Sequence, residues 1–100
     1  MPSTILTFAE FWVKLRDAML DVDALAKTDP DPMIGSIQRQ LQYVAKWTNG
    51  GKRPAQADLD KLTFGLMASR AVDDVDRRLA QELYDLASYL QYWKKGPNDP

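Results

Sequence analysis

The sequence predicts an all-α protein that folds as a compact antiparallel bundle of four helices. Apolar residues recur at three- and four-residue intervals in four separate segments, which is typical of helices that bury one face. Short stretches rich in Pro, Gly, Asn and Asp separate these segments and favour turns, and no segment has the pattern of a strand. Because 100 residues suffice for one hydrophobic core, we expect a single domain over residues 1–100. It should be ordered from about residue 5 to about residue 95, with a frayed C-terminal tail.

The first helix is expected from Thr7 to about Lys27. Thr7 and Glu10 have the spacing of a capping box, in which each side chain satisfies a free backbone amide of the other residue. The expected buried face comprises Phe8, Phe11, Trp12, Leu15, Met19, Val22 and Leu25. A turn over residues 28–32 should follow, because its two prolines disfavour helical geometry in the residues before them.

The second helix is expected to begin with Asp31 as N-cap and Pro32 in the first turn. Its expected buried stripe consists of Ile34, Ile37, Leu41 and Val44. The sequence Asn49-Gly50-Gly51 should end the helix, since Asn and Gly tolerate left-handed backbone geometry.

The third helix is expected to begin between Pro54 and Asp58. Its stripe would consist of Leu59, Leu62, Leu66 and Met67, with Phe64 to one side. Gly65 lies in its interior, where glycine costs about 1 kcal/mol relative to alanine. We therefore expect another helix to come close at Gly65.

The fourth helix is expected to begin at Asp73 and Asp74, which would cap it and complement the positive end of its dipole. Its apolar residues follow one another at steps of three and four: Val75, Leu79, Leu83, Leu86, Leu90 and Trp93. The sequence from Lys94 to Pro97 should end it with cations, a glycine and a proline.

The composition argues against chemistry of the chain's own. Cysteine and histidine are both absent, which removes the usual thiolate nucleophile, the commonest general base and the commonest transition-metal ligand. We therefore expect no enzyme, catalytic residue, cofactor or metal site. The net charge of −1 favours neither nucleic acid nor a membrane surface as a partner. No stretch approaches the ~20 apolar residues of a membrane span, and the first eight residues lack the pattern of a signal peptide, so we expect a cytoplasmic protein.

Acidic residues gather in two places that need an interpretation. Asp17, Asp21 and Asp23 lie in the first expected helix, and Asp73, Asp74 and Asp76 lie at the start of the last. A paired-carboxylate active site would require a pKa raised by burial or by a close like charge, for which the sequence gives no sign. We interpret the groups as solvated faces and helix caps, with an acidic protein-binding patch as the alternative.

Cations and aromatic residues lie together around the end of the second expected helix. Arg39, Lys46, Lys52 and Arg53 flank Tyr43 and Trp47. Such a group could hold a phosphate backbone and stack bases, but the balanced charge favours local ion pairs or a protein partner. The helical angles place Phe8, Phe11, Trp12 and Trp93 at the core, whereas Tyr43, Tyr89 and Tyr92 should point to the flank or to solvent.

Three features together resemble a known family. They are Gln40-Leu41-Gln42-Tyr43-Val44, the stretch Leu59-Asp60-Lys61-Leu62-Thr63-Phe64-Gly65, and an Asp-rich step into a last amphipathic helix. This pattern is similar to that of the immunity proteins paired with type VI secretion effectors of the NAD(P) glycohydrolase kind. The likeness extends from the second expected helix to the fourth and is weaker in the first.

The resemblance implies a small cytoplasmic antitoxin that forms a heterodimer with a toxin domain and blocks its NAD-binding cleft. The match at Gln38, Gln42 and Tyr43 places part of the interface on that side of the second helix. We expect Arg39 and Lys46 of the same helix to take part as well. Asp73, Asp74 and Asp76 are the next candidates, since they could meet cations that line a dinucleotide site. Two other hypotheses on the function stay open: a helical adaptor or homodimerisation module, and a bundle that binds a small ligand between its helices.

Overall fold

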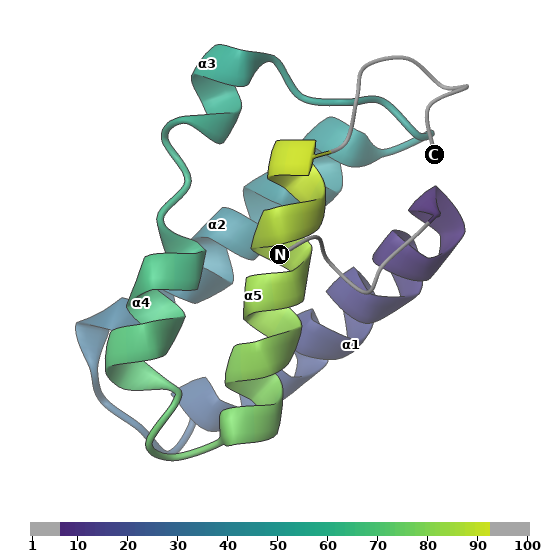
Figure 1. Cartoon of the computed structure of the whole chain (residues 1–100). Helices are drawn as coiled ribbons and strands as arrows, with labels where there is room; N and C mark the ends of the chain where they lie inside the picture. Colours follow the sequence, from purple (N-terminus) through teal and green to yellow (C-terminus); the bar gives the residue numbers. More distant parts are fainter. Residues whose placement is uncertain (1–6, 93–100) are drawn as a thin grey trace.

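The computed structural model describes residues 7–92, and within them every regular element is a helix (Figure 1). The helices are α1 (Phe8–Ala26), α2 (Pro32–Thr48), α3 (Gln56–Leu59), α4 (Phe64–Ala71) and α5 (Arg77–Tyr92). The predicted all-α class is confirmed. Trp93, the expected helix end at 94–97 and the side chain of Tyr92 lie outside what the structure describes.

The four longer helices form a ring in which each packs against two neighbours. α1 packs on α2 and α5, and α4 packs on the same two helices from the other side. Consecutive members of the ring run in opposite directions, and α3 is a single turn at one end of the bundle (Figure 1). This arrangement matches the predicted antiparallel bundle.

The predicted stripes of the first two helices are confirmed as the core of the bundle. Phe11, Leu15 and Val22 of α1 are buried. They meet the four predicted residues of α2, which are also buried: Ile34, Ile37, Leu41 and Val44. The other four predicted residues of α1 are only partly buried and pack against this core: Phe8, Trp12, Met19 and Leu25. Three- and four-residue spacing therefore located this half of the core.

Local caps fix where α1 and α2 begin. The Thr7 hydroxyl oxygen accepts a hydrogen bond from the Glu10 amide at 3.2 Å, as predicted. The second bond of the expected capping box differs, because the Glu10 carboxylate accepts from the Thr7 hydroxyl and not from the Thr7 amide. Asp31 Oδ1 accepts from the Met33 amide at 2.9 Å, and Pro32 is the first residue of α2. Gly50 and Gly51, at φ +80° and +85°, provide the left-handed backbone expected after α2.

The expectation of one continuous third helix is wrong, because the chain breaks between α3 and α4 over residues 60–63. In a single helix, the stripe through Leu59, Leu62 and Leu66 would place Phe64 on the opposite side. The break lets the largest of these side chains, Phe64, become buried (1% exposed), while Leu66 is left 56% exposed. Burial of the phenyl ring thus overrides the regular spacing.

The expected N-cap of the last helix is also wrong, by two to three residues. Asp76, rather than Asp73 or Asp74, caps α5, since its Oδ1 accepts from the Leu79 amide at 3.0 Å. Residues 72–75 form a turn in which the Val75 and Asp76 amides both donate to the Val72 carbonyl. Val72 is therefore buried, and Val75, which we expected in the core, is 59% exposed.

Tyr89 is buried, contrary to the expectation that it would point to the flank. Only 5% of it is exposed, and its ring stacks on Phe11 of α1 with centroids 4.9 Å apart. The helical angle alone placed Tyr89 at the edge of the α5 stripe, but α1 packs against that edge and covers the ring.

Candidate functional site

Four of the residues predicted for partner binding lie together on the exposed side of α2. Arg39, Gln42, Tyr43 and Lys46 line one open hollow of about 280 Å³. All four side chains are exposed, because the opposite side of the helix supplies Ile37, Leu41 and Val44 to the core. We call these four residues the α2 face.

An aromatic pair stiffens the α2 face. Tyr43 is 53% exposed, and its ring stacks on Trp47, one turn further along the helix, with centroids 5.7 Å apart and planes at 22°. Stacking restricts the tyrosine ring before any partner arrives, so less conformational entropy is lost on binding. A large, exposed and supported aromatic ring is a frequent anchor of protein interfaces.

Gln38, the fifth residue predicted on this helix, is turned toward α1. Its amide nitrogen donates to Asp23 Oδ1 at 2.6 Å, and both side chains are half-buried. The bond ties α1 to α2, so Gln38 borders the α2 face without lining its hollow.

The three predicted aspartates at the turn between α4 and α5 have different surroundings. Asp73 accepts a hydrogen bond from the Tyr84 hydroxyl at 3.0 Å and pairs with Arg77 at 3.4 Å, while Asp76 caps α5. Burial and the adjacent Asp73 carboxylate raise the pKa of the Tyr84 hydroxyl. Asp74 alone of the three is exposed and bonds to no other residue within 7–92. Asp73 and Asp76 thus hold the turn in place, and Asp74 is free for a partner.

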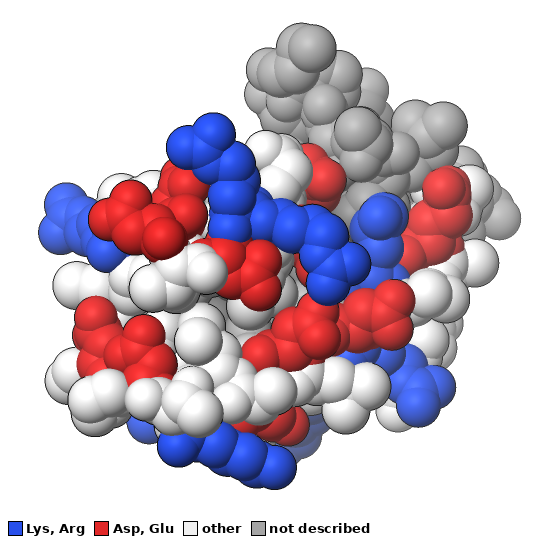
Figure 2. Space-filling view, turned by 90° about the horizontal axis from the view of Figure 1, so that it is seen from below, with Lys and Arg blue, Asp and Glu red and all other residues white. Residues whose placement is uncertain are grey.

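The structure does not join the α2 face to this turn. α2 and α5 are not neighbours in the ring, and none of the hydrogen bonds and ion pairs described between residues 7 and 92 connects the two groups. Figure 2 views the molecule from the end at which the α4–α5 turn lies, and acidic and basic side chains alternate there without a field of one sign.

Glu82, on the α5 side of the contact with α1, is an unusual acid that sequence reasoning missed. Its Oε1 atom is buried without a hydrogen-bond partner, and burial, followed by the charge of Asp21, raises the pKa of the carboxyl group. Arg78 and Lys14 act in the opposite direction. Glu82 lines neither the hollow of the α2 face nor the smaller hollow between α4 and α5. We therefore interpret the raised pKa of Glu82 as a consequence of helix packing.

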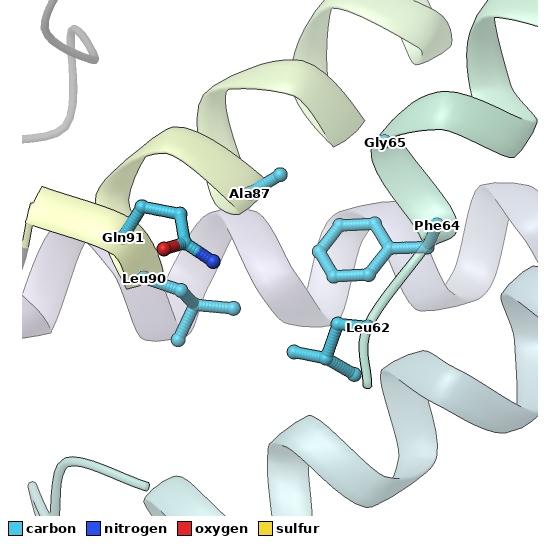
Figure 3. Close-up of a pocket in the computed structure, with 6 residues that line it drawn as sticks. All are labelled: Leu62, Phe64, Gly65, Ala87, Leu90 and Gln91. Carbon is cyan, nitrogen blue, oxygen red and sulfur yellow. The ribbon is translucent and has the colours of Figure 1, made fainter. Parts of the chain in front are cut away.

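A second hollow lies between the start of α4 and the end of α5, and Figure 3 shows its lining residues. They are Leu62, Phe64, Gly65, Ala87, Leu90 and Gln91. A Cβ atom added at Gly65 would lie 3.2 Å from the Cβ of Ala87, which confirms the predicted close approach of another helix. With about 50 Å³ the hollow has room for a water or two, far below the 300 Å³ or more typical of small-molecule sites.

The described residues thus define a class of protein: a helical bundle that exposes an aromatic, cationic helix face on α2. No group of three or more acidic side chains within 7–92 could hold a metal ion, and no helix there is long and apolar enough to cross a membrane. The sequence profile of the Tsi6 family matches residues 14–91, so the chain belongs to that family. These are the type VI secretion immunity proteins for NADase effectors.

The match confirms the resemblance drawn from the residues and extends it into the first helix. It begins at Lys14 and so includes most of α1, the helix in which the likeness is weaker. An immunity family implies a cognate toxin as partner and favours a role without catalysis. Comparison with curated proteins found no match, and comparison with solved structures found none either.

Proposed function

We propose that this chain is a cytoplasmic antitoxin that binds a cognate NAD(P) glycohydrolase effector of type VI secretion and inhibits it by occluding the NAD-binding cleft. The observation that carries the proposal is the family match over residues 14–91. Inhibition by occlusion needs no chemistry from the antitoxin, in keeping with a chain that has neither Cys nor His. The protein would act as one helical domain in a heterodimer.

The proposed contact surface consists of the α2 face, with Gln38 at its border, and the turn that contains Asp73, Asp74 and Asp76. A stable complex buries about 800 Å² on each partner, and a few anchors supply most of the affinity. Tyr43 has the exposure and support of such an anchor. Asp74 is the acidic residue of the turn that remains free to meet a cation of the toxin.

The test is co-expression with the toxin domain encoded beside this gene. The two proteins should purify as a tight complex, and cells that express the toxin should keep their NAD when this protein is present. Tyr43→Ala and Asp74→Ala should weaken the complex with little change in melting temperature, because both side chains are exposed. If the wild-type chain neither binds the toxin nor prevents NAD loss, the proposed function is wrong.

One observation favours the rival function of a homodimerisation or adaptor module. Val13 and Leu20 lie seven positions apart on the outer side of α1 and are 59% and 68% exposed. Residues at this spacing share one side of a helix, so the two apolar side chains lie on the same exposed surface, with Arg16 and Asp17 between them. A homodimer would sediment at twice the mass of the chain in the absence of toxin, and Leu20→Asp would restore the monomer.

A further inference from the structure

Charge is strongly segregated along this chain. Residues 32–57, which include all of α2, contain four cationic residues and no acidic one, so all 14 acidic residues lie elsewhere. The overall charge of −1 therefore combines a segment of charge +4 with a remainder of charge −5. The electrostatic character of a partner for α2 can be inferred from this asymmetry.

The cations of the α2 face are available to a partner. Arg39 and Lys46 are exposed, and neither forms an ion pair with an acid among residues 7–92, where the pairs are Arg77–Asp73 and Arg78–Asp21. They lie seven positions apart, hence about 10 Å along the helix. Gln42 and Tyr43 lie between them and line the same hollow.

We propose that the α2 face binds an acidic segment of the toxin, with one carboxylate at Arg39, another at Lys46 and an apolar group against Tyr43. The inference rests on the proposed function and specifies the chemistry of its partner. The two carboxylates must both lie within reach of long, flexible side chains whose backbone positions are about 10 Å apart along the helix. A protein partner fits better than nucleic acid, because two cations neutralise few phosphates, whereas the stacked Tyr43–Trp47 pair suits an apolar side chain.

The test compares two charge reversals of equal size. One variant carries Arg39→Glu and Lys46→Glu, and its control carries Lys27→Glu and Arg70→Glu, which are exposed cations outside the α2 face. Both variants have the same net charge, so a difference in their affinity for the toxin shows that the position of the reversed charges matters. Circular dichroism verifies the fold of each, and calorimetry with the purified neighbouring toxin domain gives the Kd.

We expect the α2 reversal to weaken binding by about 100-fold or more and the control by less than about threefold. Raising the salt concentration should weaken the wild-type complex and have less effect on the α2 variant. A Lys introduced at one of the toxin's acidic residues should restore part of the affinity of the α2 variant.

If the two variants lose affinity for the toxin equally, or if neither loses affinity, the inference is overturned while the proposed function stands. A wild-type chain that does not bind the toxin would instead overturn the proposed function, and the inference with it. Tight binding of a single-stranded oligonucleotide that is lost in the α2 variant alone would assign the face to nucleic acid and contradict the inference.

Discussion

The Gln40 side chain of α2 bonds to both the amide and the hydroxyl of Thr63, the residue before α4. Its Oε1 accepts from the Thr63 amide at 2.7 Å, and its Nε2 lies 3.1 Å from Thr63 Oγ1. Thr63 forms no side-chain cap of its own on α4, so a side chain from 23 positions earlier satisfies the backbone there. The bond also joins the two sequence stretches that carry the family resemblance.

Replacing Gln40 by Ala should therefore destabilise the fold. The exposed Thr63 amide would lose its acceptor, and we expect the free energy of unfolding to fall by about 0.5–1.5 kcal/mol. Urea denaturation followed by circular dichroism measures the change. Gln81→Ala, which removes an exposed bond to Asp85 within α5, is the matched control and should cost less than about 0.5 kcal/mol. Equal losses would mean that Gln40 does not fix the start of α4.

The Gln40–Thr63 bond also explains why the sequence predicted α1 and α2 well and the α3–α4 region poorly. Thr7 and Asp31 cap helices through residues two or three positions away, so short-range patterns suffice. The break before α4 depends on Gln40 and on burial of Phe64, which are tertiary facts. The spacing of apolar residues along one helix carries no information on contacts between distant segments.

The candidate site, too, could be predicted where it depends on one helix, and could not where it depends on contacts between distant segments. Arg39, Gln42, Tyr43 and Lys46 lie on one helix whose boundaries were predicted, so their common exposure could be read from helical angles. The roles of Asp73 and Asp76 depend on where α5 begins, which the sequence misplaced. Glu82 was overlooked because its buried oxygen reflects the packing of α5 on α1.

Two helical glycines should respond oppositely to alanine. Gly35→Ala should raise the free energy of unfolding by roughly 0.5–1 kcal/mol, because a Cβ there meets only the flexible end of Arg39 at 3.6 Å. Gly65→Ala should lower it, since the new methyl group would lie 3.2 Å from the Cβ of Ala87. Chemical denaturation of both variants tests this. A similar gain for Gly65→Ala would contradict the close approach of α4 and α5.

The two tyrosines, 43 and 89, should separate folding from binding. Tyr89→Ala removes a buried ring that stacks on Phe11 and should cost about 3–5 kcal/mol of stability. Tyr43→Ala should cost less than about 1 kcal/mol, since that ring is half exposed. Thermal melts give both values. A large loss for Tyr43→Ala would show that the ring is part of the fold rather than of a docking surface.

Glu82 should make stability depend on pH. Because burial and Asp21 raise the pKa of its carboxyl group, the folded chain keeps this proton to a higher pH than the unfolded chain. The stability contribution of Glu82 therefore falls as pH rises through the interval between the two pKa values. Glu82→Gln should raise Tm by a few degrees at about pH 7 and leave it nearly unchanged at about pH 3, where both states are protonated. Asp74→Asn, an equal change of charge at an exposed residue, is the control. If Glu82→Gln raises Tm by the same amount in acid, titration of Glu82 is ruled out as the cause.

Asp74 and Asp76 of the α4–α5 turn should differ in their effect on stability. Asp76→Ala removes the acceptor of the Leu79 amide and should lower the free energy of unfolding by about 1 kcal/mol. Asp74→Ala removes an exposed carboxylate with no bond to the rest of residues 7–92, so its stability should change by less than about 0.5 kcal/mol. If the complex with the toxin responds to Asp74→Ala while stability does not, the turn contributes a contact. If stability instead falls more for Asp74→Ala than for Asp76→Ala, α5 begins earlier than the structure places it.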